Sequence, residues 1–173
     1  MSEDASGEVA SGSAGRPDAL PYPDADLREH PPRSPHVMLG GLYFLARTID
    51  KTHAKLQGTL GFYKVTPGIS QYLFEWLGIT EEDFTEAVRA ANHDEDVVEW
   101  LLARADRDTF RAINQRLSER AIRDDDHFAQ VLPRYPVLRD YPHLRNWFEI
   151  FDLDDRWSFD PKNAAKVEEA ARS

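Results

Sequence analysis

The stretch LGGLYFLARTIDKTHAKL, residues 39–56, decides the fold of this chain. Its apolar side chains recur at helical spacing, and at about 100° per residue they gather on one face. That face carries Leu42, Leu45, Ala46, Ile49, His53 and Leu56. Gly40 and Gly41 are unusual near a helix start and suggest close backbone packing or a bend. The pattern predicts an amphipathic helix over about residues 39–56.

The Asp, Arg and Lys residues of this stretch lie at the edge of its apolar face or away from it. Asp50 is at the edge of the face, and Arg47 is further round. Lys51 and Lys55 point away from it.

Downstream of this stretch, boundary signals predict further helices. Gly78 is typical of a residue that ends a helix, and Thr80 with Asp83 approximates a capping box. The expected helices are about Ile69–Leu77, Glu81–Ala91 and Glu95–Ala105, one capped by Asp106 or Asp108, one capped by Asp124 or Asp125, then His143–Leu153 and Pro161–Ala171. Thr59 to Val65 forms at most a minor short hairpin. The sequence therefore predicts an all-α, irregular multi-helix fold.

Upstream of the first helix the composition changes. Residues 1–26 are rich in Ser, Gly, Ala, Asp and Pro and offer few aliphatic side chains, which predicts a disordered N-terminal tail. Arg28 to Pro35 contains three prolines and is expected to form an extended arm on the domain. A chain of 173 residues has room for one domain, which we place at residues 27–173.

Composition excludes several classes of protein. The chain has no cysteine, which rules out disulfides, thiolate zinc sites and thiol nucleophiles. No apolar run approaches the ~20 residues of a membrane helix, and the N-terminus lacks the features of a secretory signal. We therefore expect a cytoplasmic protein that does not bind membranes.

Charge is unevenly distributed along the chain. The net charge of −10 argues against a nucleic-acid binder. Residues 66–100 hold nine acids and one base, whereas residues 36–65 hold four bases and one acid. The contrast suggests either that an anionic ligand is steered to the basic segment, or simply that both segments are solvated faces.

Much of the N-terminal half resembles a bacterial family catalogued as domain of unknown function 5069. The residues that carry the resemblance are Pro32-Arg33-Ser34-Pro35, Leu39-Gly40-Gly41, Leu45-Ala46-Arg47-Thr48-Ile49-Asp50-Lys51, Ala54, Leu56, Gly58, Gly61, Tyr63, Leu77-Gly78 and Trp100. The resemblance covers Leu27 to about Ala103 and is weaker in the C-terminal third. It implies a small soluble domain and nothing about a reaction.

One polar segment is the best candidate for a site. Its candidate catalytic residues are Asp50, His53 and Tyr63, and its candidate ligand-binding residues are Arg33, His36, Arg47 and Lys51. A carboxylate beside an imidazole suits general-base chemistry, and arginines can clamp a carboxylate or phosphate. The alternative is structural: an ion pair of Arg47 with Asp50 would fix the proline arm to the first helix, and His53 would be a core histidine.

Two Asp-x-x-His sequences, Asp50 to His53 and Asp124 to His127, suggest metal ligation only weakly. Asp is shorter than the Glu of helical di-metal sites, and the second copy lies where a helix cap is expected. We therefore expect no metal and no cofactor.

Two functions stay open at this point. In the first, the polar patch on the first helix and the proline arm binds, or acts on, a small and potentially anionic metabolite. In the second, the chain is a non-enzymatic interaction module whose acidic surface over residues 66–100 meets a basic protein partner. Glycine-rich phosphate loops and the common hydrolase motifs are absent from the sequence.

Overall fold

The computed structural model describes residues 26–173, and the predicted tail therefore lies outside the described residues except for Asp26. Within them the α-helices are α1 (Leu45–Gln57), α2 (Ile69–Leu77), α3 (Glu81–Ala90), α4 (Asp94–Leu102), α5 (Arg107–Ser118), α6 (Asp125–Val131), α7 (Trp147–Ser158) and α8 (Ala164–Ala171). Two 3₁₀ helices, η1 (Pro136–Arg139) and η2 (Pro161–Asn163), complete the set. Over these residues the fold is all-α, as predicted. No strand forms between residues 26 and 173, and the region expected to hold a short hairpin is a loop.

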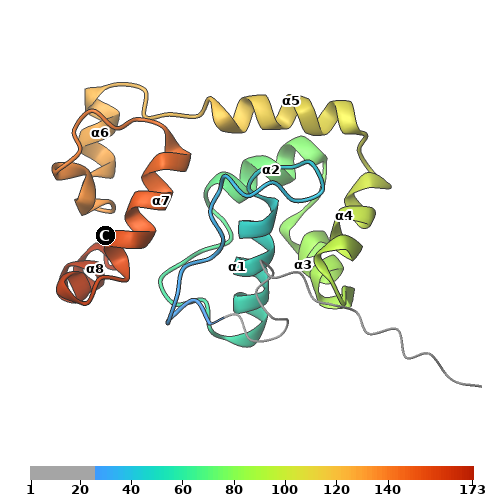
Figure 1. Ribbon diagram of the computed structural model, residues 1–173, viewed down its shortest axis with the longest axis horizontal. Coiled ribbons are helices and arrows are strands. Elements are labelled where there is room, and N and C mark those ends of the chain that lie inside the picture. The colour runs from blue at the N-terminus through green and yellow to red at the C-terminus, as the bar shows by residue number, and fades with distance from the viewer. Residues whose placement is uncertain (1–25) are drawn as a thin grey trace, which may run out of the picture.

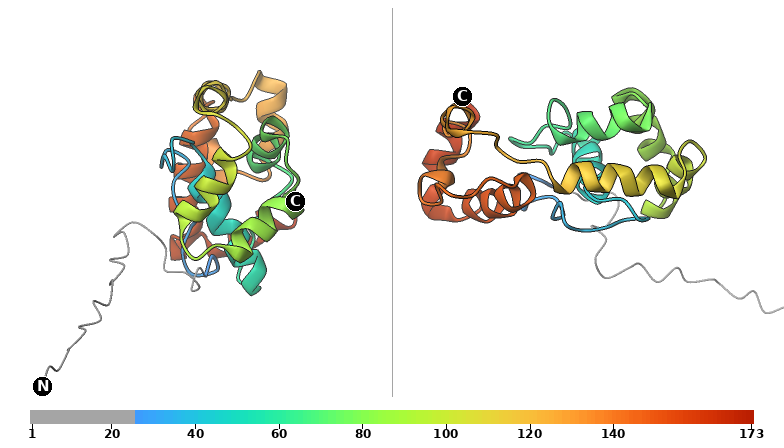
Figure 2. Two further views of the ribbon diagram at one scale, coloured as in Figure 1. Left: turned by 90° about the vertical axis from the view of Figure 1, so that its right-hand side faces the viewer. Right: turned by 90° about the horizontal axis from the view of Figure 1, so that it is seen from above.

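The helices fall into two groups (Figure 1). Helices α1 to α5 form the larger group, with α1 near its centre, and α6 to α8 form the smaller group. Helix α5 runs along the edge of the larger group and leads the chain across to α6, as the view from above shows (Figure 2). The proline arm and the loop after α1 lie between the two groups.

Each group contains an apolar cluster. The larger cluster buries side chains of α1 to α5, including Leu45, Phe84 and Phe110. The smaller cluster buries Ile122, Leu138 and Ile150. Trp147, at the start of α7, packs against both clusters, so the two are in contact. The assignment of residues 27–173 to one domain stays a prediction.

Helix α1 begins six residues later than the sequence pattern predicted. Residues 39–44 form a tight turn in which Leu39 and Leu42 exchange backbone hydrogen bonds of 3.1 and 3.0 Å. Gly40 and Gly41 adopt φ angles of 59° and 86°, and Phe44 adopts 65°. A right-handed helix cannot include these left-handed conformations, so α1 begins only after Phe44. The predicted start at Leu39 was therefore wrong, although the expected bend is present.

Replacing Gly40 with alanine is expected to lower the free energy of unfolding by about 2–4 kcal/mol, combining left-handed strain with overpacking. A Cβ atom at this position would overlap both methyl groups of Val98. Gly58 is a matched control, since it has a φ of 73° but nothing within 4 Å of a Cβ. Its alanine variant should lose only about 1 kcal/mol. Urea unfolding of both variants checks this, and equal losses would show that Val98 gives way.

Local capping signals hold in the structure. Thr80 and Asp83 form the predicted reciprocal capping box, Gly78 ends α2 with a φ of 67°, and Asp106 and Asp124 cap α5 and α6. The seventh helix was misplaced: it was expected at His143–Leu153 but starts at Trp147, because Asn146 accepts hydrogen bonds from the first backbone amides.

Helix α1 is buried almost all round, which the amphipathic pattern did not predict. Lys51, expected to point away from the apolar face, is only 6% exposed, and Arg47 and Asp50 are 3% and 2% exposed. Leu56, expected in the core, is 37% exposed. The polar side of α1 thus faces protein rather than water. Its ionisable side chains therefore need either a partner of opposite charge or a neutral protonation state.

Candidate functional site

Arg47 joins the two helix groups through a buried ion pair. Its guanidinium donates to both carboxylate oxygens of Asp155 on α7, at 2.7 and 3.1 Å, and to the Arg33 carbonyl at 3.2 Å. The hydroxyl of Tyr63 donates to the same carboxylate at 2.6 Å. Burial alone would lower the pKa of Arg47, but the hydrogen bonds to Asp155 raise it, so the guanidinium stays charged. Burial and the Asp155 charge raise the pKa of Tyr63, so the phenol keeps its proton.

A second network fixes the proline arm. The Arg33 backbone amide and side chain both donate to Asp50, with side-chain distances of 2.7 to 3.1 Å, and the guanidinium donates to Asp94 on α4 at 2.6 Å. The ion pair expected between Arg47 and Asp50 is therefore wrong in its partner, since Arg33 pairs with Asp50 instead. Arg33 and Asp50 serve as structural anchors in this arrangement.

The two candidate histidines, His36 and His53, lie in separate places. His36 Nδ1 is 2.8 Å from Asp152 on α7, and the Ser34 hydroxyl donates to the same carboxylate at 3.0 Å. His53 is half-buried on α1, and burial lowers its pKa. Neither histidine lines the cavity between α1 and α7 that is described below. The structure thus does not assemble an Asp50–His53 pair around a ligand space.

Lys51 occupies an unusual position on α1. Its ammonium donates to Ser70 at 3.1 Å and lies 5.2 Å from the Phe44 ring centroid. No carboxylate within the described part of the chain forms an ion pair with it. Burial and the neighbouring Arg47 charge lower the pKa of Lys51 to about 7. Near neutral pH, a large share of Lys51 is therefore an uncharged amine.

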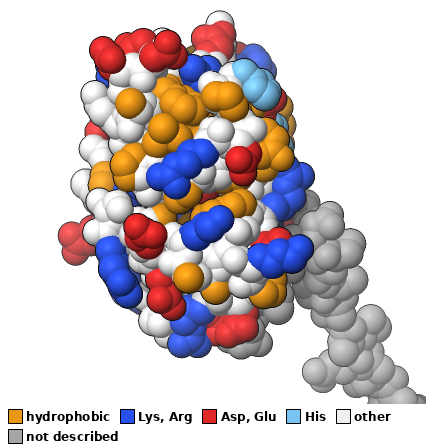
Figure 3. Space-filling view, turned by 90° about the vertical axis from the view of Figure 1, so that its left-hand side faces the viewer, with side chains coloured by type: hydrophobic (Ala, Val, Ile, Leu, Met, Phe, Trp, Pro, Cys, Tyr) orange, Lys and Arg blue, Asp and Glu red, His pale blue; other side chains and the backbone are white. Residues whose placement is uncertain are grey.

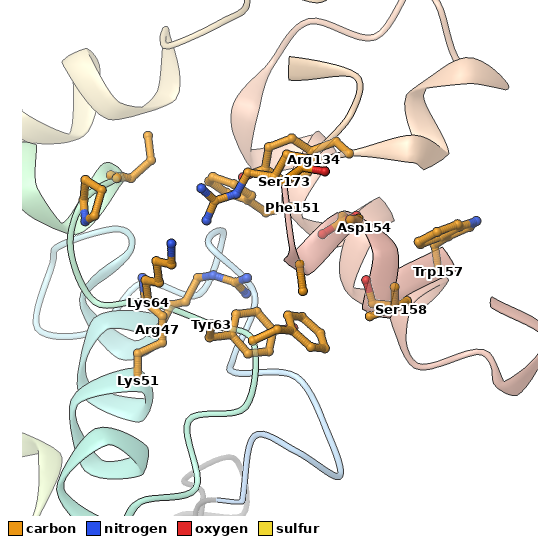
Figure 4. Close-up of a pocket in the computed structure, with 18 of the residues that line it drawn as sticks. Arg47, Lys51, Tyr63, Lys64, Arg134, Phe151, Asp154, Trp157, Ser158 and Ser173 are labelled. Atoms are coloured by element: carbon orange, nitrogen blue, oxygen red, sulfur yellow. The ribbon is translucent and has the colours of Figure 1, made fainter. Parts of the chain in front are cut away.

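A cavity of about 180 Å³ lies where α1 and the loop after it meet α7 and α8 (Figure 4). Its apolar wall is largely aromatic and is made by Phe44, Phe62, Tyr135, Phe151 and Trp157. Small residues of α8 close one side. Such a wall suits a planar or apolar ligand body, because flat rings stack well on aromatic faces.

The polar lining of this cavity is mainly cationic. Arg47, Lys51 and Lys64 approach from the α1 side, and Arg134 and Asp154 approach from the opposite side (Figure 4). Burial and the adjacent Asp155 charge raise the pKa of Asp154 to about 7. Since Asp155 already neutralises Arg47, Lys64 and Arg134 leave the cavity with a positive surplus.

A neighbouring hollow of about 520 Å³ extends this basic region. The two spaces share Gly68, Ile69, Tyr135 and Phe151. Arg120, Arg123 and His127 line the second hollow, and the Arg120 guanidinium lies 3.7 Å from the Tyr72 ring centroid. Figure 3 shows basic, hydrophobic and some acidic side chains interspersed over the face that carries α6 to α8, with further acidic side chains at its upper end.

Three of the seven residues predicted from sequence, Arg47, Lys51 and Tyr63, line the cavity. Arg33, Asp50, His36 and His53 do not. Sequence analysis missed Lys64, Arg134, Asp154 and the Asp155 partner of Arg47. The two acids could have been found in the sequence, because Asp154 and Asp155 are consecutive carboxylates in a helical segment that is rich in aromatic residues.

These observations define an all-helical protein with a cationic, aromatic-walled cavity between its two helix groups. The family model described as "Domain of unknown function (DUF5069)" matches residues 29–157, so the chain belongs to this family, as its sequence motifs indicated. The match includes most of α7 and ends before α8. None of the curated proteins compared with the chain matches it. No helix between residues 26 and 173 is long and apolar enough to cross a membrane.

Proposed function

We propose that this protein binds a small organic anion, a carboxylate or phosphate with a planar apolar body, in the cavity between α1 and α7, and that it does so in the cytoplasm. The observation that carries the proposal is the pairing of aromatic walls with cations that lack a carboxylate partner among residues 26–173. Lys64 and Arg134 are such cations, and both face the cavity. A ligand carboxylate or phosphate would supply the missing negative charge.

The rest of the chain makes this cationic site noteworthy. The protein carries a net charge of −10, so the charge of the cavity has the opposite sign to that of the whole chain. Lys64 and Arg134 line the cavity while exposed to solvent, and their surplus positive charge attracts anions to it. The aromatic wall then selects among anions for those with a flat apolar part.

Replacing both Lys64 and Arg134 with glutamine is expected to weaken benzoate or phenyl phosphate binding at least about tenfold, because each charge-assisted hydrogen bond contributes about 1.5–3 kcal/mol. Isothermal titration measures this, with benzyl alcohol as the neutral probe. Arg139→Gln is the matched control, since Arg139 is exposed and does not line the cavity. Equal affinity of the wild type and the double variant for both anions would overturn the proposed site. Native mass spectrometry of the purified protein would show any anion retained from the cell.

The alternative proposal is a non-enzymatic module that binds a basic protein through the acidic segment over residues 66–100. A groove of about 530 Å³ between α3 and α4 supports it, lined by acids that include Glu82 and Glu86 and by Trp100. Several other acids of the segment have internal roles, since Asp94 binds Arg33 and Asp96 caps α4. Stoichiometric association with a basic partner that weakens with salt would favour this alternative.

A further inference from the structure

We propose that Lys51 is a covalent attachment point, whose Nζ forms an imine with an aldehyde or ketone carbonyl carried by the anion that this cavity binds. The inference rests on the proposed function and deepens it, because it names the ligand class as an oxo acid or an aldehyde-bearing anion. Its grounds are the burial of Lys51, its hydrogen bond to Ser70 and the cavity that it lines.

The hydrogen bonds around Lys51 have a fixed direction. The Thr48 hydroxyl donates its only proton to the Phe44 carbonyl at 2.9 Å. Ser70 must therefore donate to Thr48 across the 3.0 Å contact between their hydroxyls. The Ser70 oxygen is left to accept from Lys51 Nζ at 3.1 Å. One position of the nitrogen is thus held by protein, and Lys51 also lines the cavity.

The surroundings of Lys51 favour a nucleophilic amine. The charged groups that act on it most are Arg47 and Asp50 on α1, Glu81 on α3 and Asp155 on α7. Asp155 is bound to Arg47, and Asp50 is bound to Arg33, so neither is free to hold an ammonium at Lys51. Burial then lowers the pKa of Lys51 to about 7, and an uncharged amine is the form that attacks carbonyls.

Imine formation at Lys51 balances with one proton from a buffer acid in solution. The Lys51 nitrogen attacks the carbonyl carbon, the C–N bond forms, and the carbonyl oxygen becomes a hydroxyl as a proton moves from nitrogen to oxygen. The carbinolamine then loses its hydroxyl as water after accepting one proton from the buffer acid, which leaves a protonated imine and the conjugate base of the buffer. No oxidant or reductant takes part.

The cavity contains a matched second amine. Lys64 lines the same space but is exposed to solvent. The remaining lysines, Lys55, Lys162 and Lys166, do not line the cavity. Selectivity among these amines therefore separates a built site from ordinary surface reactivity.

The test uses 4-carboxybenzaldehyde, a flat aromatic aldehyde with a carboxylate, on the full chain at pH 7. Sodium cyanoborohydride reduces any imine to a stable secondary amine, and peptide mapping by mass spectrometry locates it. We expect Lys51 to be labelled at least about tenfold faster than any other lysine, since its neutral fraction at pH 7 is far larger. Excess benzoate should suppress the labelling. Lys51→Met should abolish the fast phase, and Lys64→Met should keep it.

The outcomes separate the two proposals. Wild-type mapping needs no variant, so a folding defect in Lys51→Met cannot obscure it. Benzoate binding without a Lys51 adduct would overturn the imine and leave the anion site standing. Labelling spread over lysines according to their exposure would overturn the imine as well. A Lys51 adduct that benzoate does not suppress would overturn the coupling of the amine to an anion site.

Discussion

Replacing Asp155 with alanine is expected to lower the free energy of unfolding by about 3–5 kcal/mol, because the change leaves a buried charge without its partner. Arg47 is 3% exposed and gives two hydrogen bonds to this carboxylate. The Tyr63 hydroxyl would lose its acceptor at the same time. Guanidinium chloride unfolding at pH 7 measures the loss.

Asp152 is the matched control for this change. It lies on the same helix, and its carboxylate binds His36 and Ser34, but its side chain is 30% exposed. Asp152→Ala should therefore lower the free energy of unfolding by no more than about 1 kcal/mol. The double variant Arg47→Met with Asp155→Leu should recover most of the loss, because an apolar pair of similar size removes both buried charges. A single-variant loss below that of Asp152→Ala would show that the buried pair does not hold the two helix groups together.

Replacing Lys51 with methionine is expected to raise the free energy of unfolding by about 1–3 kcal/mol at pH 7. Each pKa unit corresponds to about 1.4 kcal/mol, and burial moves this lysine from 10.5 to about 7. The lost hydrogen bond to Ser70 offsets part of the gain. Lys55→Met is the matched control on the same helix: Lys55 is exposed and paired with Glu81 at 2.5 Å, so its loss should slightly destabilise the protein.

The pH dependence of the Lys51 effect has a definite sign. Between about pH 7 and 10.5 the unfolded chain binds a proton at Lys51 that the folded chain does not. This group therefore makes the wild type more stable as pH rises through that window, and its full penalty applies below about pH 7. The advantage of Lys51→Met should be largest at and below about pH 7 and should fade by about pH 10. An advantage that does not change with pH would mean that packing, rather than the ammonium, is responsible.

Such a gain would come with a loss of ligand chemistry. A buried amine lowers the stability of the fold, and destabilising groups of this kind are typical of functional positions. Lys51→Met is thus expected to be more stable and unable to form the adduct.

Sequence alone predicted the fold class and most helix ends, because those signals act over about four residues. Thr80, Asp83 and Gly78 are examples, since each bonds to backbone within its own helix end. The start of α1 could not be placed because the apolar run continues through Gly40 and Gly41. Only the left-handed backbone there, packed against Val98, shows that the chain turns before the helix begins.

The candidate site was partly predictable for the same reason. The dense polar run in α1 pointed to Arg47 and Lys51, but helical periodicity placed Lys51 away from the apolar face. Its contact with Ser70 on α2 is brought about by tertiary packing, which periodicity does not show. Asp155 is 108 residues from Arg47, so no local pattern could pair the two.

That separation also sets the order in which the molecule can be completed during its synthesis. A ribosome adds about 5–20 residues per second, so roughly 5–20 s pass between the addition of Arg47 and that of Asp155. Throughout that interval the Arg47 guanidinium has no Asp155 to bind, and burying it alone would be unfavourable. We therefore expect the nascent α1 to keep its polar side in water, or against a chaperone, until α7 arrives. The final packing of α1 then takes place only after α7 has been synthesised.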